Sequence, residues 1–206
     1  MRKPLAAVAS AALALGALIG TGVAAPPPAA AAPYCGITWG SLPKYTPTES
    51  DEAWFSPHTV KAVRSGRHAC FDRLVIDVRG QGIWHNVRYA PVRDRAGQPM
   101  SLRGAADLHV FFTNPSTTST GRLTWSPGKT SEVLDVSGYR TFRQVALANH
   151  ARDTVVGEDE NGQQFTSVQG YTSIGLGVRA RLPFRTFVLD GPGTGQRLVI
   201  DVAHRW

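Results

Sequence analysis

The side chains best suited to proton transfer or metal binding in this sequence are its six histidines: His58, His68, His85, His109, His150 and His204. No two of them have the H-x-x-x-H or H-E-x-x-H spacing that places two imidazoles around zinc on one helical face. His85 precedes an alternating segment and His109 lies within an apolar one, so we expect both at a sheet edge or in a core. The histidine pattern therefore predicts no metal site.

Nucleophilic and carboxylate catalysis also lack a local motif. Ser173, in YTSIG, lacks one of the two glycines of the G-x-S-x-G turn. A Ser-His-Asp set assembles in space from distant residues, so the sequence alone leaves that possibility open. Glu158, Asp159 and Glu160 could in principle run glycoside hydrolysis. They lie in VGEDENGQQ, whose Asn161-Gly162 pair is typical of a solvated hairpin turn.

The glycine-rich stretch Gly191–Gly195 resembles a phosphate-binding loop in composition. It lacks the Lys-Ser/Thr pair of such loops, and a strand pattern rather than a helix follows it. We expect a β-turn there. Taken together, these patterns predict a protein that is not an enzyme and that needs no cofactor.

One stretch combines arginines with aromatic rings and is the candidate binding site: Trp84, Arg88, Tyr89, Arg93 and Arg95, followed by Arg103. Guanidinium groups attract an anionic polymer, and aromatic rings stack on sugars or bases. For an exported chain, an anionic cell-wall polymer fits better than nucleic acid. The alternative, that these residues form an ordinary solvated face of a sheet, stays open.

The elements that must position these residues belong to one domain. The chain has 206 residues, with 22 Lys and Arg against 15 Asp and Glu, a net charge of +7. It contains 21 glycines and 14 prolines, and 42% of its residues are hydrophobic. This composition is globular and rich in turns, which excludes collagen and coiled coil.

The first 32 residues read as a signal peptide. Arg2 and Lys3 precede an apolar run of small residues, and Ala29–Ala32 offers small residues for cleavage, so we expect a secreted mature chain starting near Pro33. Cleavage near Ala25 and a retained membrane anchor are the alternatives, but the run is diluted by Ala and Gly and no later segment could span a bilayer. Removing the signal leaves 20 basic and 15 acidic side chains, a charge of +5.

The two cysteines, Cys35 and Cys70, both follow the predicted cleavage site. In an oxidising compartment a disulfide between them is the default, and loop entropy gives it roughly 3–4 kcal/mol of stabilisation. A reactive thiol or a metal ligand is the alternative, and no second motif supports it.

Residues 33–58 form a proline-containing segment ahead of the predicted domain at 59–206. With Trp39, Trp54 and Phe55 as anchors, the segment is predicted to be an extended arm laid on the domain, because exposed rings would be costly. A flexible linker is the alternative.

From Thr59 onward the chain predicts strands separated by turns, without long helices. The clearest is 71–79, where one face carries Leu74, Ile76 and Val78 and the other carries Arg73, Val75 and Asp77, a period of two. In 141–148 a helical turn competes, but alternation favours a strand. The predicted strands are 60–64, 71–79, 86–89, 108–113, 140–151, 173–180, 184–189 and 197–202.

The hexapeptide RLVIDV occurs twice, at 73–78 and 197–202. The repeat predicts two strands in equivalent places of a pseudo-symmetric pair of sheets; similar packing demands on unrelated strands are the alternative. Positions i and i+4 of one strand lie ~13 Å apart. We therefore expect the Arg and Asp of each copy to pair across neighbouring strands.

The order of these elements resembles the AMIN-like domain of secreted and lipid-anchored actinobacterial proteins. The resemblance rests on VRSGRHACFDRLVIDVRG, VRYAPVRDRAGQPMSLRGAADLHVFF and PFRTFVLDGPGTGQRLVIDV, at 63–80, 87–112 and 183–202. Cys70 stands where the family usually has Gly, and the turn at 190–195 is longer than usual. The resemblance implies a β-sandwich without catalysis, related to envelope-targeting AMIN domains.

Together these inferences predict an all-β sandwich that binds cell-envelope polysaccharide, either peptidoglycan or an anionic wall polymer. Trp84, Arg88, Tyr89, Arg93 and Arg95 are the expected binding residues. The alternative is a protein interaction module or inhibitor that uses the N-terminal arm. The sequence leaves the ligand and the oligomeric state open.

Overall fold

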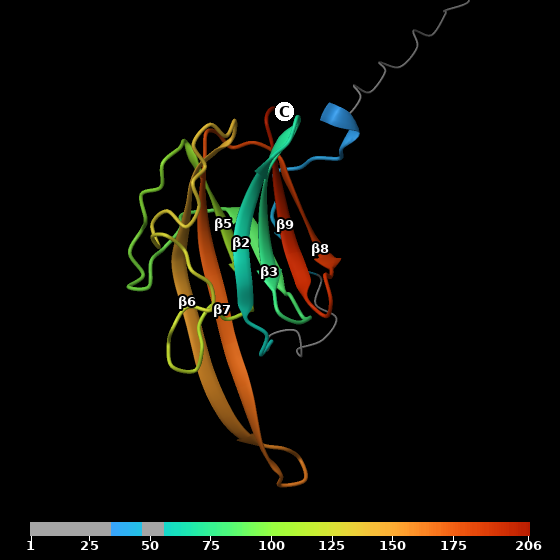
Figure 1. Cartoon of the computed structure of the whole chain (residues 1–206), viewed down its shortest axis with the longest axis vertical. Coiled ribbons are helices and arrows are strands. Elements are labelled where there is room, and N and C mark those ends of the chain that lie inside the picture. The colour runs from blue at the N-terminus through green and yellow to red at the C-terminus, as the bar shows by residue number, and fades with distance from the viewer. Residues whose placement is uncertain (1–33, 47–55) are drawn as a thin grey trace, which may run out of the picture. The chain divides into compact units, whose positions relative to one another are not determined.

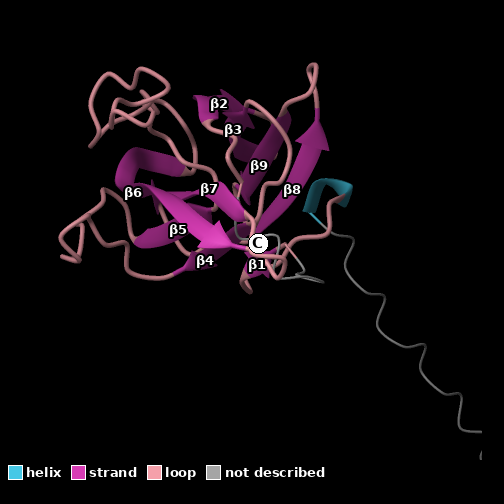
Figure 2. Ribbon diagram, turned by 90° about the horizontal axis from the view of Figure 1, so that it is seen from below, coloured by secondary structure: helices cyan, strands magenta, loops and turns pink. Residues whose placement is uncertain are grey.

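The fold consists of two antiparallel β-sheets that face each other, as Figures 1 and 2 show. The computed structural model describes residues 34–46 and 56–206, so the predicted signal peptide and the predicted anchors Trp54 and Phe55 lie outside the described residues. The prediction of an all-β sandwich is confirmed. Within the described ranges, no helix has both the length and the apolar character needed to cross a membrane.

The four-stranded sheet is built from the segments with the clearest alternation. In spatial order its strands are β2 (Val60–Arg67), β3 (Phe71–Val78), β9 (Gln196–Ala203) and β8 (Phe184–Asp190). Every neighbouring pair is antiparallel. Branched and aromatic side chains on one phase of each strand give these segments a face to bury, which is why they form a sheet.

The five-stranded sheet contains a strand that sequence reasoning did not predict. Its spatial order is β1 (Lys44–Tyr45), β4 (His85–Tyr89), β5 (Ala106–Phe112), β7 (Gln164–Val178) and β6 (Phe142–Glu158). The unpredicted strand is β1, which is only two residues long and pairs with β4 through Lys44 opposite Val87 and Tyr45 opposite Asn86. The ambiguous 141–148 segment is strand, as predicted.

The hydrophobic core lies between the sheets and is made of the inward phase of both. Ile76 and Ile200 contribute from the four-stranded sheet, and Phe112, Ile174 and Leu176 from the other; none of these side chains is exposed. Burying a side chain of this size contributes roughly 1.5–3 kcal/mol. The inward phase is therefore committed to stability, and binding must use the outward phases or the loops.

The hairpin of β6 and β7 is longer than predicted and runs past the other strands, as Figure 1 shows. The pairing of β5 with β7 begins at Thr172, so among the described strands residues 164–171 of β7 pair only with β6. At the tip, Asp159 accepts backbone hydrogen bonds from Asn161 and Gln163 on its side-chain oxygen. The expected hairpin turn is confirmed, and the carboxylate of Asp159 shapes it.

The two RLVIDV segments lie side by side in β3 and β9. They share one sheet, so the expectation of equivalent places in two sheets is replaced by a local two-fold relation within a single sheet. In their antiparallel register Arg73 is opposite Asp201 and Asp77 is opposite Arg197. The predicted cross-strand pairing is confirmed at Arg73 and Asp201, whose guanidinium and carboxylate form two hydrogen bonds.

The other end of the repeat pairs differently. Asp77 binds Arg64 of β2 through two hydrogen bonds of 2.7 and 2.9 Å. The Arg197 guanidinium donates instead to the carbonyl oxygen of Asp190. Neighbouring strands therefore break the symmetry that the repeat imposes on the backbone.

The described part of the N-terminal arm lies against the domain, as predicted. Gly40 forms a bridge to Phe184 of β8, and the Trp39 ring packs edge-on against Phe71 with the centroids 6.0 Å apart. The predicted disulfide between Cys35 and Cys70 is present. It joins the start of the arm to the residue preceding β3.

Candidate functional site

A row of partly exposed aromatic rings crosses the outer face of the five-stranded sheet. It consists of Trp84, immediately before β4, Phe111 of β5 and Tyr171 of β7. The Trp84 and Phe111 centroids are 6.2 Å apart and nearly perpendicular, whereas Phe111 and Tyr171 stack with centroids 5.3 Å apart at 29°. We call these three residues the aromatic strip.

Strand register explains how residues so distant in sequence share this face. Side chains opposite each other in paired strands point to the same side. Asn86 is opposite Phe111, and Phe111 is opposite Ser173, so this row faces outward while the alternate residues enter the core. Tyr45 of β1 is opposite Asn86, which places a ring that is 62% exposed on the same face.

Polar groups border the aromatic strip on the next row of the sheet. The Arg88 guanidinium donates to Asn86 Oδ1 at 3.2 Å, and His109 Nε2 lies 2.7 Å from Ser173 Oγ. Burial, with a smaller contribution from the charge of Arg88, lowers the pKa of His109. A neutral imidazole beside amide and hydroxyl groups offers both donors and acceptors to a ligand on this face.

The loop between β4 and β5, residues 90–105, covers the adjoining part of the face. It fits because β7 carries glycines there: a Cβ on Gly175 would lie 2.8 Å from Leu102 Cδ1, and one on Gly177 would lie 2.1 Å from the carbonyl oxygen of Arg103. Val92 of the same loop is fully buried. The loop therefore covers one part of the outer face of the five-stranded sheet and leaves the aromatic strip beside it.

The structure brings only part of the predicted binding set together. Trp84 and Arg88 share the phase of Asn86 and lie on the outer face. Tyr89 has the opposite phase: its hydroxyl donates to the carbonyl oxygen of Leu182 at 2.6 Å, and its ring packs against Phe184 in the core. Burial raises the pKa of Tyr89 to about 12. Tyr89 therefore belongs to the packing between the sheets.

The two remaining predicted arginines lie in the 90–105 loop. Arg93 donates to the carbonyl oxygen of Gly97 at 2.8 Å across a tight turn. Arg95 is exposed at that turn, and its charge contributes, after burial, to the lowered pKa of His150 on β6. Both arginines lie in the loop that covers part of the sheet, separate from the row of rings.

Sequence reasoning missed Phe111, Tyr171 and Tyr45. The signal for Phe111 was available, because in ADLHVFF it has the opposite phase to buried Leu108, Val110 and Phe112, which marks an exposed ring on a half-buried strand. No sequence signal places Tyr45, because a two-residue strand has no period to read.

The aromatic strip has the composition of a binding surface. A row of rings with amide, hydroxyl and guanidinium groups at its border suits stacking on the apolar face of a sugar together with hydrogen bonds to its hydroxyls. Within the part of the chain that the structure describes, no three His, Cys, Asp or Glu side chains are grouped so as to hold a metal ion.

Comparison with known proteins gives one result. The family model described as the AMIN-like domain matches residues 58–204, which includes both sheets apart from β1. No curated protein and no solved structure matches the chain.

Proposed function

Because the chain belongs to the AMIN-like domain family, whose domains are non-catalytic and associated with the cell envelope, we propose that it is exported and binds an envelope polysaccharide. The binding surface is the aromatic strip with its polar border. The observation that carries the proposal is the contact of Phe111 with both Trp84 and Tyr171, which lines up three partly exposed rings across neighbouring strands.

The arrangement favours an extended ligand over a compact one. Neighbouring strands lie about 4.8 Å apart, so rings from β5 and β7 offer successive stacking positions along one line. A glycan chain laid across the strands meets several rings, and each contact adds apolar burial. The strip lies on an open sheet face, which leaves both ends of a polymer free to continue.

The polar border supports a glycan that carries carboxylates or other anionic groups. Arg88 is exposed beside Asn86 and has no carboxylate partner within the described residues. A guanidinium in this position can bind an acidic substituent of a sugar that stacks on Phe111. The peptide-bearing glycan of the cell wall has this combination of sugar rings and carboxylates.

The alternative function, protein recognition by the N-terminal arm, has less support. In the described part of the arm, the Trp39 ring packs on Phe71 and lies under the Arg185 guanidinium, 5.5 Å from the ring centroid. This ring is engaged by its own domain and is not free as an anchor for a partner.

The test is retention of the purified chain on isolated cell walls. Trp84→Ala and Tyr171→Ala are each expected to reduce the retained fraction several-fold, because stacking on one ring contributes about 1 kcal/mol or more. Trp206→Ala is the matched control, since Trp206 is 71% exposed and lies outside the strip. Equal retention of all three variants would overturn the proposal.

Salt and wall chemistry separate the contributions of rings and charge. Stacking is expected to survive 0.5 M salt, whereas attraction through Arg88 weakens because salt screens exposed charges. Walls stripped of anionic polymers distinguish the two wall ligands that the sequence left open. Retention on stripped walls identifies peptidoglycan, and its loss identifies the anionic polymer.

A further inference from the structure

A second candidate site lies at one end of the sandwich, away from the aromatic strip. Here β2, β7 and β9 end and β3 and β6 begin, near the C-terminus in Figure 1. Five arginines belong to this end, which we call the basic end: Arg67, Arg140, Arg143, Arg179 and Arg205. They come from four separate parts of the chain, so strand topology brings their charges together.

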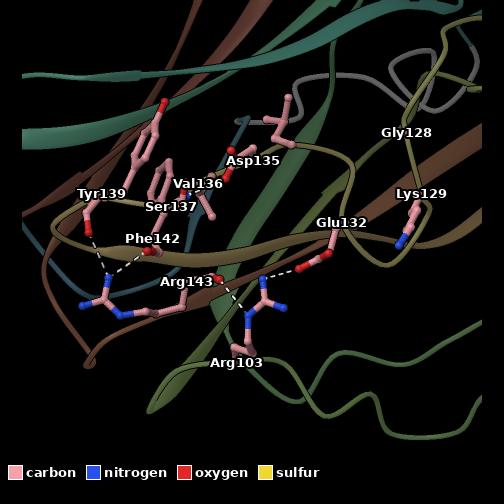
Figure 3. A pocket seen from close by; sticks show the side chains of 12 residues that line it. Arg103, Gly128, Lys129, Glu132, Asp135, Val136, Ser137, Tyr139, Phe142 and Arg143 are labelled. Carbon is pink, nitrogen blue, oxygen red and sulfur yellow. Dashed lines mark hydrogen bonds and ion pairs between the residues drawn. The ribbon is translucent and has the colours of Figure 1, made fainter.

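The arginines of the basic end bind carbonyl oxygens in place of carboxylates. Arg143 Nη1 donates to the carbonyl oxygens of Tyr139 and Phe142 at 3.1 and 2.8 Å, as Figure 3 shows. Arg179 donates to the carbonyl oxygen of His204. Carbonyl groups satisfy the donors of a guanidinium but leave its positive charge without a counter-ion.

The other arginines of this end contact aromatic rings or solvent. The Arg67 guanidinium lies 6.0 Å from the centroid of Tyr139, and that of Arg205 lies 4.6 Å from the centroid of Tyr34. Arg140 is exposed. Among the residues that the structure describes, none of the five forms an ion pair. Arg64, Arg73 and Arg185 of the four-stranded sheet differ, because they pair with Asp77 or Asp201.

The buried acid at this end already has its own partners. Asp72 accepts hydrogen bonds from the backbone N–H groups of Thr141 and Phe142, and its other oxygen lies 3.1 Å from His204 Nε2. His204 Nδ1 faces the carbonyl oxygen of Ala69 at 3.2 Å. Both ring nitrogens of His204 therefore have an oxygen within hydrogen-bond distance. Asp72 is therefore matched to His204, and the arginines remain unneutralised.

A cleft opens between these charges. It has a volume of about 250 Å³ and is lined by Arg67, His68, Asp72, Gly138, Arg140 and His204. This is several times the ~30 Å³ that one water molecule occupies, so a tetrahedral oxyanion fits. The His68 ring stacks on Phe71 at a centroid distance of 4.4 Å, which holds the imidazole at the cleft.

Gly138 lines both this cleft and a neighbouring hollow of about 760 Å³, whose lining residues Figure 3 shows. The hollow adds Arg143, Lys129 and the carboxylate of Asp135 to the surface, while Arg103 and Glu132 pair with each other within it. A chain longer than one phosphate group that is held in the small cleft can therefore extend toward this hollow, where Arg143 and Lys129 lie.

We propose that the cleft between Arg67 and Arg140 binds a phosphate group, carried by a phosphodiester polymer of the envelope or present as free phosphate. The two guanidinium groups come from different walls, one from β2 and one from the segment before β6. Two guanidinium groups at one cleft match the several oxygens of a tetrahedral anion, whereas a planar carboxylate needs only one. This site goes beyond the proposed glycan surface and is independent of it.

The experiment titrates the full purified chain with inorganic phosphate, with a soluble poly(glycerol phosphate) and with a neutral glycan. The double variant Arg67→Gln/Arg140→Gln is expected to bind phosphate at least about tenfold more weakly, because it removes two charge-assisted contacts. The matched control, Lys61→Gln/Arg79→Gln, removes two exposed cations at the opposite end and is expected to change affinity by less than about twofold.

Each outcome decides the proposal. Binding of the polymer identifies a phosphodiester ligand, and binding of inorganic phosphate alone identifies a free-phosphate site. An equal loss in both double variants shows attraction by net charge only and overturns the site, as does an absence of binding to either probe. Trp84→Ala is expected to keep phosphate affinity, which separates failure of this site from failure of the aromatic strip. An unchanged thermal transition of each variant confirms that it is folded.

Discussion

The guanidinium of Arg73 and the carboxylate of Asp201 join the two copies of RLVIDV by a pair of hydrogen bonds, 2.6 Å from Nε to Oδ1 and 2.9 Å from Nη2 to Oδ2. Arg185 adds a third bond to Oδ2 at 2.9 Å, and the Asp201 side chain is fully buried beneath the two arginines. One carboxylate thus connects the three strands β3, β9 and β8. Removing one partner of such a buried pair is strongly destabilising, because the remaining charge is left buried without compensation.

Asp201→Asn is expected to lower the free energy of unfolding by about 3 kcal/mol, because it leaves two partly buried arginines without their anion. Asp77→Asn is the control, since its partner Arg64 is 54% exposed, and a loss below about 1 kcal/mol is expected. Urea denaturation of both variants measures the difference. Equal losses would show that burial of Asp201 does not set the strength of this pair.

Acid is expected to destabilise the protein through His85. This side chain is buried, with Nδ1 2.8 Å from Thr46 Oγ1 and Nε2 3.0 Å from Thr186 Oγ1, and burial lowers its pKa from 6.5 to about 4. Between these values the unfolded chain binds a proton that the folded chain does not. Stability therefore falls as the pH drops below 6.5, by about 2 kcal/mol from this residue at pH 5.

The measurement for His85 is urea denaturation at a series of pH values from 7.5 to 4.5. His85→Gln is less stable at neutral pH but cannot titrate, so its stability is expected to approach that of the native chain as the pH falls. Parallel curves for the two proteins across this range would contradict the assignment.

Removal of the disulfide is expected to lower the free energy of unfolding by roughly 3–4 kcal/mol, because Cys35 and Cys70 are 35 positions apart and the crosslink restricts the unfolded chain. The Cys35→Ser/Cys70→Ser variant, measured by thermal and urea unfolding, tests this. A reducing agent is expected to destabilise the native chain to the same extent and to leave the double variant unchanged. If complete reduction of the bond leaves the free energy of unfolding of the native chain unchanged, the predicted stabilisation is wrong.

Gly177→Ala is expected to destabilise the fold by about 2 kcal/mol or more, because the new Cβ would overlap the carbonyl oxygen of Arg103 in the loop that covers the sheet. Gly128→Ala is the matched control: its Cβ would meet nothing within 4 Å, and the change is expected to stay within about 1 kcal/mol. Chemical denaturation compares the two. Similar free energies of unfolding for the two variants would mean that the 90–105 loop shifts at little cost and is not held tightly against the sheet.

Local pattern was sufficient for much of the fold. The predicted strands correspond to eight of the nine observed, and the turn that begins at Asp159 lies where Asn161-Gly162 indicated. Period-two alternation indicates a strand with one buried face, and turn residues such as Asn-Gly indicate the local backbone conformation of a turn. The extra length of β6 and β7 was not predicted, because their ends form a two-stranded ribbon with exposed, mixed side chains and no buried phase.

The candidate site shows where sequence reasoning is insufficient. Trp84 and Tyr89 are close in sequence and were grouped for that reason, yet five positions along an extended chain reverse the phase, so one ring faces outward and the other enters the core. Phe111 and Tyr171 are 60 positions apart and stack on each other. Proximity in sequence is a poor guide to a shared face on a sheet, where register decides the neighbours.

The sequence by itself determined an all-β chain and the phase of its strands, because alternation is a local property of each segment. It also determined the Cys35–Cys70 pairing, because the chain has no other cysteine. Only the tertiary structure decided that the two RLVIDV segments pair with each other, that three rings form one strip, and that arginines from four parts of the chain meet at one end. These juxtapositions depend on strand order and register, which are set by the packing of the whole core between the two sheets.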